Sequence, residues 1–104
     1  NMIHVIATID AKPDCKQAIL TELLAIRPEV LLEDGCLEYT PLALRPNALG
    51  MEVTNHPNRL TLVEKWASEE HLKRHLETEH FLRYKAATES LVEAVSINVF
   101  EPLA

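Results

Sequence analysis

Glycine and cysteine are scarce in this sequence of 104 residues, and each scarcity excludes a kind of site. Glycine occurs only at positions 35 and 50, so the chain has neither a glycine-rich phosphate loop nor a dinucleotide fingerprint. We therefore expect no tightly bound flavin or nicotinamide, and no other cofactor. Cys15 and Cys36 form no Cys-x-x-Cys pair, which indicates two free packing thiols in a cytoplasmic protein.

Positive charge is also scarce, because ten Lys and Arg residues stand against sixteen Asp and Glu residues, for a net charge of −6. No basic cluster is present to neutralise phosphates, which argues against nucleic acid or an anionic membrane as a partner. No apolar run is long enough to cross a bilayer, and no signal peptide is recognisable. We expect Met2 to be the native first residue and 2–104 to form a single domain.

Apolar periodicity predicts an alternation of strands and helices. Segments rich in β-branched residues predict strands at 2–10, 36–44, 59–67 and 94–103. A first helix is predicted between the first two strands, bent or interrupted at Pro28 and ended by Gly35. A second helix, capped by Ser68, is expected to break near Thr78 and to restart. The resulting β-α-β-β-α-β order is that of a ferredoxin-like α+β fold, with a strand-like segment expected inside the long connection at 45–58.

The strands predict a sheet with one apolar and one mixed face. The apolar face carries Ile3, Val5, Ala7, Ile9, Leu60, Leu62, Glu64, Trp66, Val95, Ile97 and Val99. The mixed face carries His4, Ile6, Thr8, Thr61, Val63, Lys65, Ser96, Asn98 and Phe100. Two arrangements are compatible with this pattern. Either helices cover the apolar face and leave the mixed face partly in water, or two subunits pack their apolar faces together and the mixed face lines a cavity beneath the helices.

The segments GCLEY (35–39) and VEKWASEEHLKRHLETEHF (63–81), with the order of elements, resemble the antibiotic biosynthesis monooxygenase family, which includes quinol monooxygenases. The resemblance covers nearly the whole chain. Its most specific part is the pattern E-x-W-x-S-x-E-x-L-x-x-H-x-x-T-x-H-F, matched by Glu64, Trp66, Ser68, Glu70, Leu72, His75, Thr78, His80 and Phe81. The pattern is a strong signal of family and a weak signal of reaction, because related members include cofactor-free oxygenases, haem degraders and an isomerase.

The resemblance implies a dimeric α+β barrel in which two sheets pack face to face, and it favours the second arrangement of the faces. It also implies a cofactor-independent monooxygenase that oxidises a quinol or another small polyphenol with O2. Haem degraders resemble the chain around Trp66 as well, but they pair this Trp with an Asn on the first strand and a His late in the second helix. Those positions hold Thr8, and Tyr84 and Lys85, which argues against haem degradation.

Three residues are predicted to carry the reaction: His75, Trp66 and Glu64. His75 would accept a phenolic proton, since imidazole titrates near neutral pH, and Trp66 would stack on the aromatic ring. Glu64 shares a strand face with Trp66 and, if buried, would act as a base or orient His75. Each residue has a structural alternative. His75 could only satisfy backbone groups at the helix break, Trp66 could be a large core side chain, and Glu64 could form a surface ion pair.

Five further residues are predicted to bind substrate: Tyr39, His80, Thr8, His4 and Phe81. Tyr39 would hydrogen-bond a substrate oxygen, although Pro41 leaves the facing of its strand open. His4 would line the cavity from the mixed face, with a satisfied core histidine as the alternative. His80 would assist in acid–base chemistry or, alternatively, satisfy backbone groups at the helix break.

His71 and His75 stand one helical turn apart and could clamp a metal ion. Neither an intervening Glu nor a third ligand is recognisable, so no metal site is predicted. Two other functions remain open from the sequence. One is an isomerase-type enzyme of the same fold, active without oxygen, and the other is a binding dimer in which His75 and Trp66 only pack.

Overall fold

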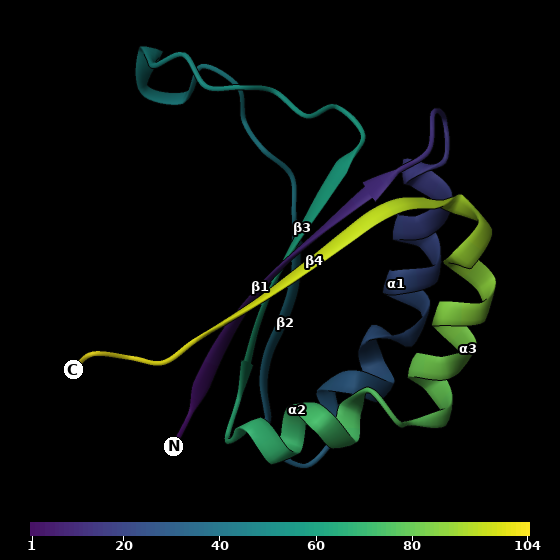
Figure 1. Cartoon of the computed structure of the whole chain (residues 1–104), viewed down its shortest axis with the longest axis vertical. Helices are drawn as coiled ribbons and strands as arrows, with labels where there is room; N and C mark the ends of the chain where they lie inside the picture. Colours follow the sequence, from purple (N-terminus) through teal and green to yellow (C-terminus); the bar gives the residue numbers. More distant parts are fainter.

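The computed structural model describes all residues from 1 to 104. The strands and helices follow the predicted β-α-β-β-α-β order, with the second helical region in two parts (Figure 1). Their bounds are β1 Ile3–Ala11, α1 Lys16–Leu31, β2 Cys36–Leu42, β3 Arg59–Trp66, α2 Glu69–His75, α3 Glu79–Thr88 and β4 Val92–Phe100. The prediction of a ferredoxin-like α+β fold is confirmed. None of the helices has the length and apolar character that a membrane span requires.

The strands form one antiparallel sheet in the order β2-β3-β1-β4. In this register Glu64 of β3 lies between Val5 of β1 and Tyr39 of β2. Directly paired residues point to the same side of a sheet, so Tyr39 shares a face with Glu64 and Trp66. The register therefore settles the facing of β2, which the sequence left open.

The helices cover the apolar face of the sheet, so the prediction that the mixed face lies beneath them is wrong. Val5, Leu62 and Trp66 are buried on the covered side, whereas Ile6 on the other side is 40% exposed. Helix α1 turns an apolar stripe toward the sheet, made of Ile19, Leu23, Ile26 and Val30. An apolar stripe packs on an apolar face without stranding polar groups, and this decides between the two arrangements.

The mixed face has no helix over it, as Figure 1 shows for the side of the sheet turned away from α1 and α3. Its polar groups pair with one another near the edge, where Lys65 Nζ lies 3.4 Å from Oε1 of Glu38. His4 and Thr8 lie on this open face and are half-buried. The sheet therefore separates them from the side chains beneath the helices.

Helix α1 continues through Pro28, so the predicted interruption at this residue does not occur. Proline removes one backbone N–H and the hydrogen bond that it would donate toward residue 24. Ile26 and Val30, on either side of the proline, are both buried against the sheet. Their packing holds the last turn in place and outweighs the lost hydrogen bond, and the helix ends at Leu31.

Thr78 forms the break between α2 and α3, as predicted. Its hydroxyl donates to the carbonyl oxygen of His75 at 2.8 Å, near the end of α2. The same Oγ1 accepts from the backbone N–H of Phe81 at 3.2 Å, which caps the start of α3. These two bonds hold the corner between the helices and bring the rings of His75 and Phe81 to 5.0 Å between centroids.

The connection at 45–58 projects from the body of the molecule as an arm (Figure 1). It contains a short 3-10 turn at Ala48–Gly50 and no strand, so the strand-like segment expected there is absent. Leu49 and Met51 at its tip are exposed. The isolated arm offers no neighbouring strand with which residues 50–54 could pair, which explains why their β propensity is not realised.

Candidate active site between the sheet and the helices

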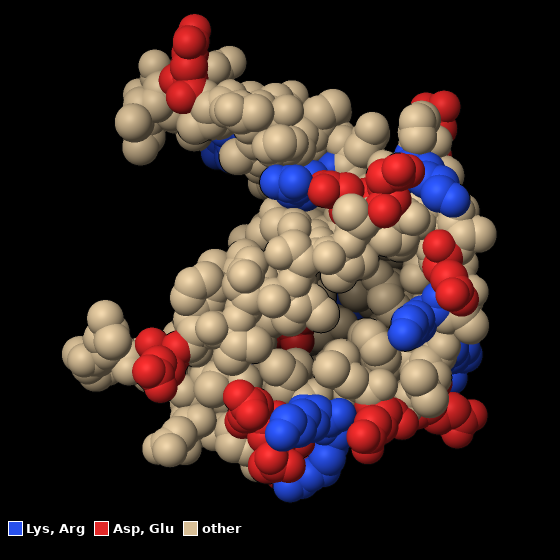
Figure 2. Space-filling model, viewed as in Figure 1, with Lys and Arg blue, Asp and Glu red and all other residues tan.

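A cavity of about 510 Å³ lies between the apolar face of the sheet and helices α2 and α3. Figure 2 shows a hollow between the two layers in this region. Eighteen residues line the cavity and thirteen of them are hydrophobic. Its polar side chains are few, namely Glu64, His75, Lys85, Thr88 and Glu89. An apolar cavity of this size with a few convergent polar groups is typical of a small-molecule site.

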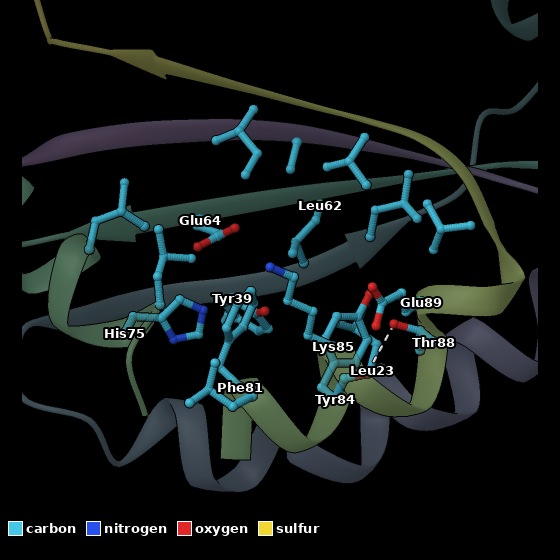
Figure 3. A pocket seen from close by; sticks show the side chains of 18 residues that line it. Leu23, Tyr39, Leu62, Glu64, His75, Phe81, Tyr84, Lys85, Thr88 and Glu89 are labelled. Atoms are coloured by element: carbon cyan, nitrogen blue, oxygen red, sulfur yellow. Dashed lines mark hydrogen bonds between the residues drawn. The ribbon is translucent and has the colours of Figure 1, made fainter. Parts of the chain in front are cut away.

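Glu64 is a buried carboxyl group on the sheet side of the cavity (Figure 3). Trp66 Nε1–H donates a hydrogen bond to its Oε1 at 2.9 Å, and no hydrogen bond within the protein reaches Oε2. Burial raises the pKa of Glu64 to about 7, against the lowering effect of the Trp66 hydrogen bond and with a smaller contribution from the Glu33 charge. At neutral pH this carboxyl can therefore both accept and release a proton.

Trp66 supports Glu64 and does not wall the cavity. Its side chain is completely buried, and the residue is absent from the lining. Its ring packs against His75 with centroids 4.8 Å apart. The position is incompatible with the predicted stacking of Trp66 on a substrate ring. Its contacts instead fix the carboxyl of Glu64 and the imidazole of His75.

His75 lies across the cavity from the sheet, at the end of α2 (Figure 3). Its Nδ1 is 2.8 Å from Oε2 of Glu33, and its Nε2 makes no hydrogen bond within the protein. Burial lowers the pKa of His75 because it disfavours the imidazolium, while the nearby Glu33 opposes this shift. His75 is therefore held as a neutral imidazole that donates from Nδ1 to Glu33, which leaves Nε2 as an acceptor toward the cavity.

Aromatic rings surround these two groups. Tyr39 and Phe81 both contact the ring of His75, at centroid distances of 5.4 Å and 5.0 Å. Tyr39 lines the cavity beside Glu64, and burial raises its pKa, so its phenol stays protonated and can donate a hydrogen bond. Tyr84 on α3 continues the aromatic wall. The arrangement provides several ring faces and edges for a flat aromatic molecule.

The structure brings together five of the eight predicted site residues around this cavity and places three elsewhere. Glu64, His75, Tyr39 and Phe81 line the cavity, and Trp66 supports it from behind. His80 is outside the lining, bound to carboxylates on α1 and in the turn that follows it. His4 and Thr8 lie on the opposite face of the sheet, so their predicted contact with a ligand in this cavity is wrong.

Glu33, Lys85 and Glu89 are functional candidates that sequence reasoning missed. Lys85 and Glu89 line the cavity from the end of α3 and its following turn, and Figure 3 shows Lys85 extending into the cavity. In the sequence, Lys85 and Glu89 each look like a solvated helix residue. Glu33 follows the end of α1 in a turn that contains Gly35, whose φ is +81°. A Cβ on Gly35 would collide with the His71 ring, at 2.3 Å, so glycine is what allows α2 to pack onto this turn.

Glu33, His75 and His80 are the side chains best placed to hold a metal ion, since their donor atoms all lie within 4.8 Å of one another. His71 is not part of this group, because its ring turns toward Ser68 and Asp34. Both cysteines are free. Burial raises the pKa of the Cys36 thiol to about 11, so this residue is no nucleophile at neutral pH.

The family model for antibiotic biosynthesis monooxygenases matches residues 2–87. The chain belongs to the antibiotic biosynthesis monooxygenase family. It is 34% identical to the protein named probable quinol monooxygenase YgiN of Escherichia coli, over 97% of this chain and 98% of YgiN. The membership predicted from residues 35–39 and 63–81 is confirmed.

Solved structures of related proteins have the same fold. The chain superimposes on PA3566 from Pseudomonas aeruginosa with a TM-score of 0.82, at 32% identity over 99% of this chain and 95% of the other. Rv0793 from Mycobacterium tuberculosis gives a TM-score of 0.82 at 27% identity, over 100% of this chain and 97% of the other. Within such a family the fold is shared more widely than the chemistry, so the reaction has to be argued from the cavity.

Proposed function

We propose that this protein is a cofactor-independent monooxygenase that oxidises a quinol or a polycyclic phenol with O2. The observation that carries the proposal is that two proton acceptors, Glu64 with a pKa of about 7 and the neutral His75, face one apolar cavity walled by aromatic rings. The volume of about 510 Å³ lies within the range of small-molecule sites and has room for a bicyclic ring system.

The chemistry that this cavity supports begins with deprotonation of a phenolic hydroxyl. The electron-rich phenolate then gives an electron to O2, so the protein has to remove the proton, hold the ring and exclude water. For a quinol with a free ring position, the ring loses two hydroxyl hydrogens and one ring hydrogen, gains a hydroxyl group, and the second oxygen atom leaves as water. The product is a hydroxyquinone, and the four electrons lost by the quinol reduce one O2.

We assign His75 as the base, because its Nε2 is a free acceptor on the cavity side. Glu64 is assigned to accept the proton of the second hydroxyl, or to donate a proton to the oxygen atom that leaves as water. Its pKa of about 7 suits both the uptake and the release of a proton. Tyr39 is assigned as a hydrogen-bond donor to a ring oxygen. Phe81 and Tyr84 are assigned to ring contacts from α3.

The test is oxygen uptake with menadiol, corrected for uncatalysed oxidation and run with catalase and superoxide dismutase. We expect one O2 consumed per quinol, a hydroxyquinone product, and label from 18O2 in that product. His75→Gln and Glu64→Gln are expected to lower kcat by a factor of about 100. The matched control Glu69→Gln, at an exposed carboxylate on α2, should not change the rate. Uptake equal to the protein-free rate would refute the proposal.

An isomerase is the second candidate, because two proton acceptors on one cavity could also move a proton between two positions of a substrate without oxygen. Anaerobic incubation with an enolisable hydroxy-ketone in deuterated water distinguishes the two. Exchange of a substrate hydrogen for deuterium under argon, lost in His75→Gln, would favour the isomerase. Oxygen-dependent turnover of the quinol alone would favour the monooxygenase.

We also propose that the open face of the sheet packs against the same face of a second subunit. This corrects the predicted contact, which used the apolar face. Apolar side chains at the centre and the edge of the open face support the proposal, since Ile6 is 40% and Phe100 is 49% exposed. Sedimentation equilibrium should give twice the chain mass of 11.8 kDa for the wild type. Ile6→Asp should shift the protein to a monomer, and Leu24→Asp on the exposed side of α1 should not.

A further inference from the structure

Three side chains that can ligate a metal meet behind the wall of the cavity, each from a different element. Glu33 comes from the turn after α1, His75 from the end of α2 and His80 from the first turn of α3. Oε2 of Glu33 lies 2.8 Å from Nδ1 of His75 and 2.7 Å from Nε2 of His80. One carboxylate oxygen and two imidazole nitrogens therefore converge on one small volume.

The cluster is shielded from water. The exposed fraction of the side chain is 2% for His75, 11% for Glu33 and 14% for His80. Packing therefore fixes the three side chains before any ligand arrives. Donors that are already held in place lose little conformational freedom when an ion binds, which favours binding over that of a group of solvated surface side chains.

The types of donor in the cluster select a class of metal ion. Two imidazoles and one carboxylate are a common ligand set for Zn2+ and other divalent transition metals of the first row. The hard cations Mg2+ and Ca2+ prefer oxygen atoms alone, and two of the three donors here are nitrogen atoms. Three protein ligands leave the fourth position of a tetrahedral site to a water molecule.

The donor atoms need only a small movement to bind such an ion. A tetrahedral Zn2+ ion with bonds of about 2.0–2.1 Å holds two ligand atoms roughly 3.3 Å apart. The Glu33 oxygen is already closer than this to both nitrogen atoms. The two nitrogen atoms lie no more than 4.8 Å apart, so they have to approach each other by at most about 1.5 Å. His80 can supply most of this movement, because it is the most exposed of the three side chains.

The charges around the cluster leave Glu33 available to a cation. Its only ion-pair partners are the two histidines, because Arg83 pairs with Glu29 instead. Oε2 of Glu29 lies 3.3 Å from Nδ1 of His80, the ring nitrogen on the side away from the cluster. Carboxylates commonly stand on this side of a histidine that binds a metal ion.

We infer that Glu33, His75 and His80 form a binding site for Zn2+ or a similar divalent transition metal ion, which ties the turn after α1 to helices α2 and α3. Neither Glu33 nor His80 lines the cavity, so the ion lies behind the cavity wall. Its role is to fix the layer of helices over the sheet. The inference does not rest on the proposed function, and a failure of quinol oxidation would leave it unchanged.

Zn2+ binding to protein that has been freed of metal with EDTA and dialysed is the first test. Calorimetric titration with zinc chloride should give one Zn2+ per chain. Glu33→Gln and His80→Ala should each weaken binding at least about 100-fold, because even a partner that only orients a ligand is worth about 10- to 100-fold. His71→Gln, on α2 one turn before His75, is the matched control and should bind as the wild type does. Equal binding in Glu33→Gln and wild type would show an adventitious ion only and would overturn the inference.

Thermal unfolding tests whether the ion ties the helices together. Free Zn2+ at 100 times its Kd should raise the Tm of the wild type by at least about 10 °C, because the ion binds the folded chain and the cluster does not exist in the unfolded one. Mg2+ at the same concentration should leave Tm unchanged, and so should Zn2+ with Glu33→Gln. An equal shift with both cations would overturn the inference.

A crystal structure of the wild type grown with Zn2+ tests the ligands without any substitution. Anomalous scattering at the zinc edge should show an ion within about 2.0–2.2 Å of Oε2 of Glu33, Nδ1 of His75 and Nε2 of His80. An ion at the contact between His71 and Asp34, with none at the cluster, would overturn the inference.

Discussion

The substitution Glu64→Gln tests whether burial of this carboxyl costs stability. Glutamine has nearly the same shape and can still accept the hydrogen bond of Trp66 Nε1–H, which is 2.9 Å from Oε1 in the wild type. The carboxyl pKa rises from 4.5 to about 7 in the folded protein, chiefly because of burial. At about 1.4 kcal/mol for each tenfold change, this corresponds to roughly 3 kcal/mol between the protonated and the ionised form.

The sign of the effect follows from where the protons are bound. Between pH 4.5 and 7 the folded protein keeps the Glu64 proton while the unfolded chain has lost it. The free energy of unfolding therefore falls as the pH rises through this window, and the loss is complete above about pH 7. Glu64→Gln cannot ionise and removes this contribution. We expect the variant to gain about 3 kcal/mol relative to wild type between pH 4.5 and pH 8.

The assay is urea denaturation of both proteins at pH 4.5, 5.5, 6.5, 7.5 and 8, at one protein concentration. The quantity compared is the difference in the free energy of unfolding between variant and wild type, since other titrating groups then cancel. Glu38→Gln, at a carboxylate that forms a surface ion pair with Lys65, is the control and should show a difference that changes far less with pH. A constant difference for Glu64→Gln would refute an upward-shifted pKa and with it the acid–base role.

Three further substitutions test single contacts. Trp66→Phe removes the indole donor of Glu64, so it should raise the carboxyl pKa further, move the pH optimum of quinol oxidation upward and lower stability by about 1–3 kcal/mol. His75→Gln should make the free energy of unfolding less sensitive to acid. Burial lowers the pKa of His75, so the stability that the neutral ring contributes is lost as the pH falls below the unfolded value of 6.5. If the free energy of unfolding of the variant changed with pH as steeply as that of wild type, this would contradict the prediction. Thr78→Ala should lower stability by about 1 kcal/mol in urea denaturation, whereas Thr78→Ser, which keeps the hydroxyl, should lose much less.

The order of elements and the family could be predicted from the sequence because both depend on local signals. Alternation marks the strands, Ser68 and Thr78 mark the helix starts, and the pattern from Glu64 to Phe81 marks the family. Which face of the sheet the helices cover could not be predicted in the same way. Both faces contain large apolar side chains, and the outcome depends on the stripe of α1, which is distant in the sequence from β3 and β4.

The candidate site could be predicted only in part, because some of its contacts join residues that are distant in the sequence. Glu64 and His75 lie within the conspicuous segment, and their burial brings them to one cavity. The partner of His75 is 42 residues away in the sequence, and only the turn at Gly35 carries Glu33 to it. The role of Trp66 also could not be predicted without the distance between its indole nitrogen and Glu64. A tryptophan two residues from a glutamate can either stack on a ligand or donate a hydrogen bond to that glutamate. The hydrogen bond to Oε1 decides for the second.

The corner at Thr78 fixes how the wall of the cavity can vary. Its single hydroxyl joins the last turn of α2 to the first turn of α3. The same oxygen atom therefore fixes the position of both helix ends. A residue inserted between Thr78 and Phe81 would rotate the phenyl ring by about 100° around the helix axis and away from the imidazole. This part of the wall can accept changes of side-chain type but not of chain length. The arm at 45–58, which carries no such constraint, is the place where the chain can lengthen or shorten at little cost.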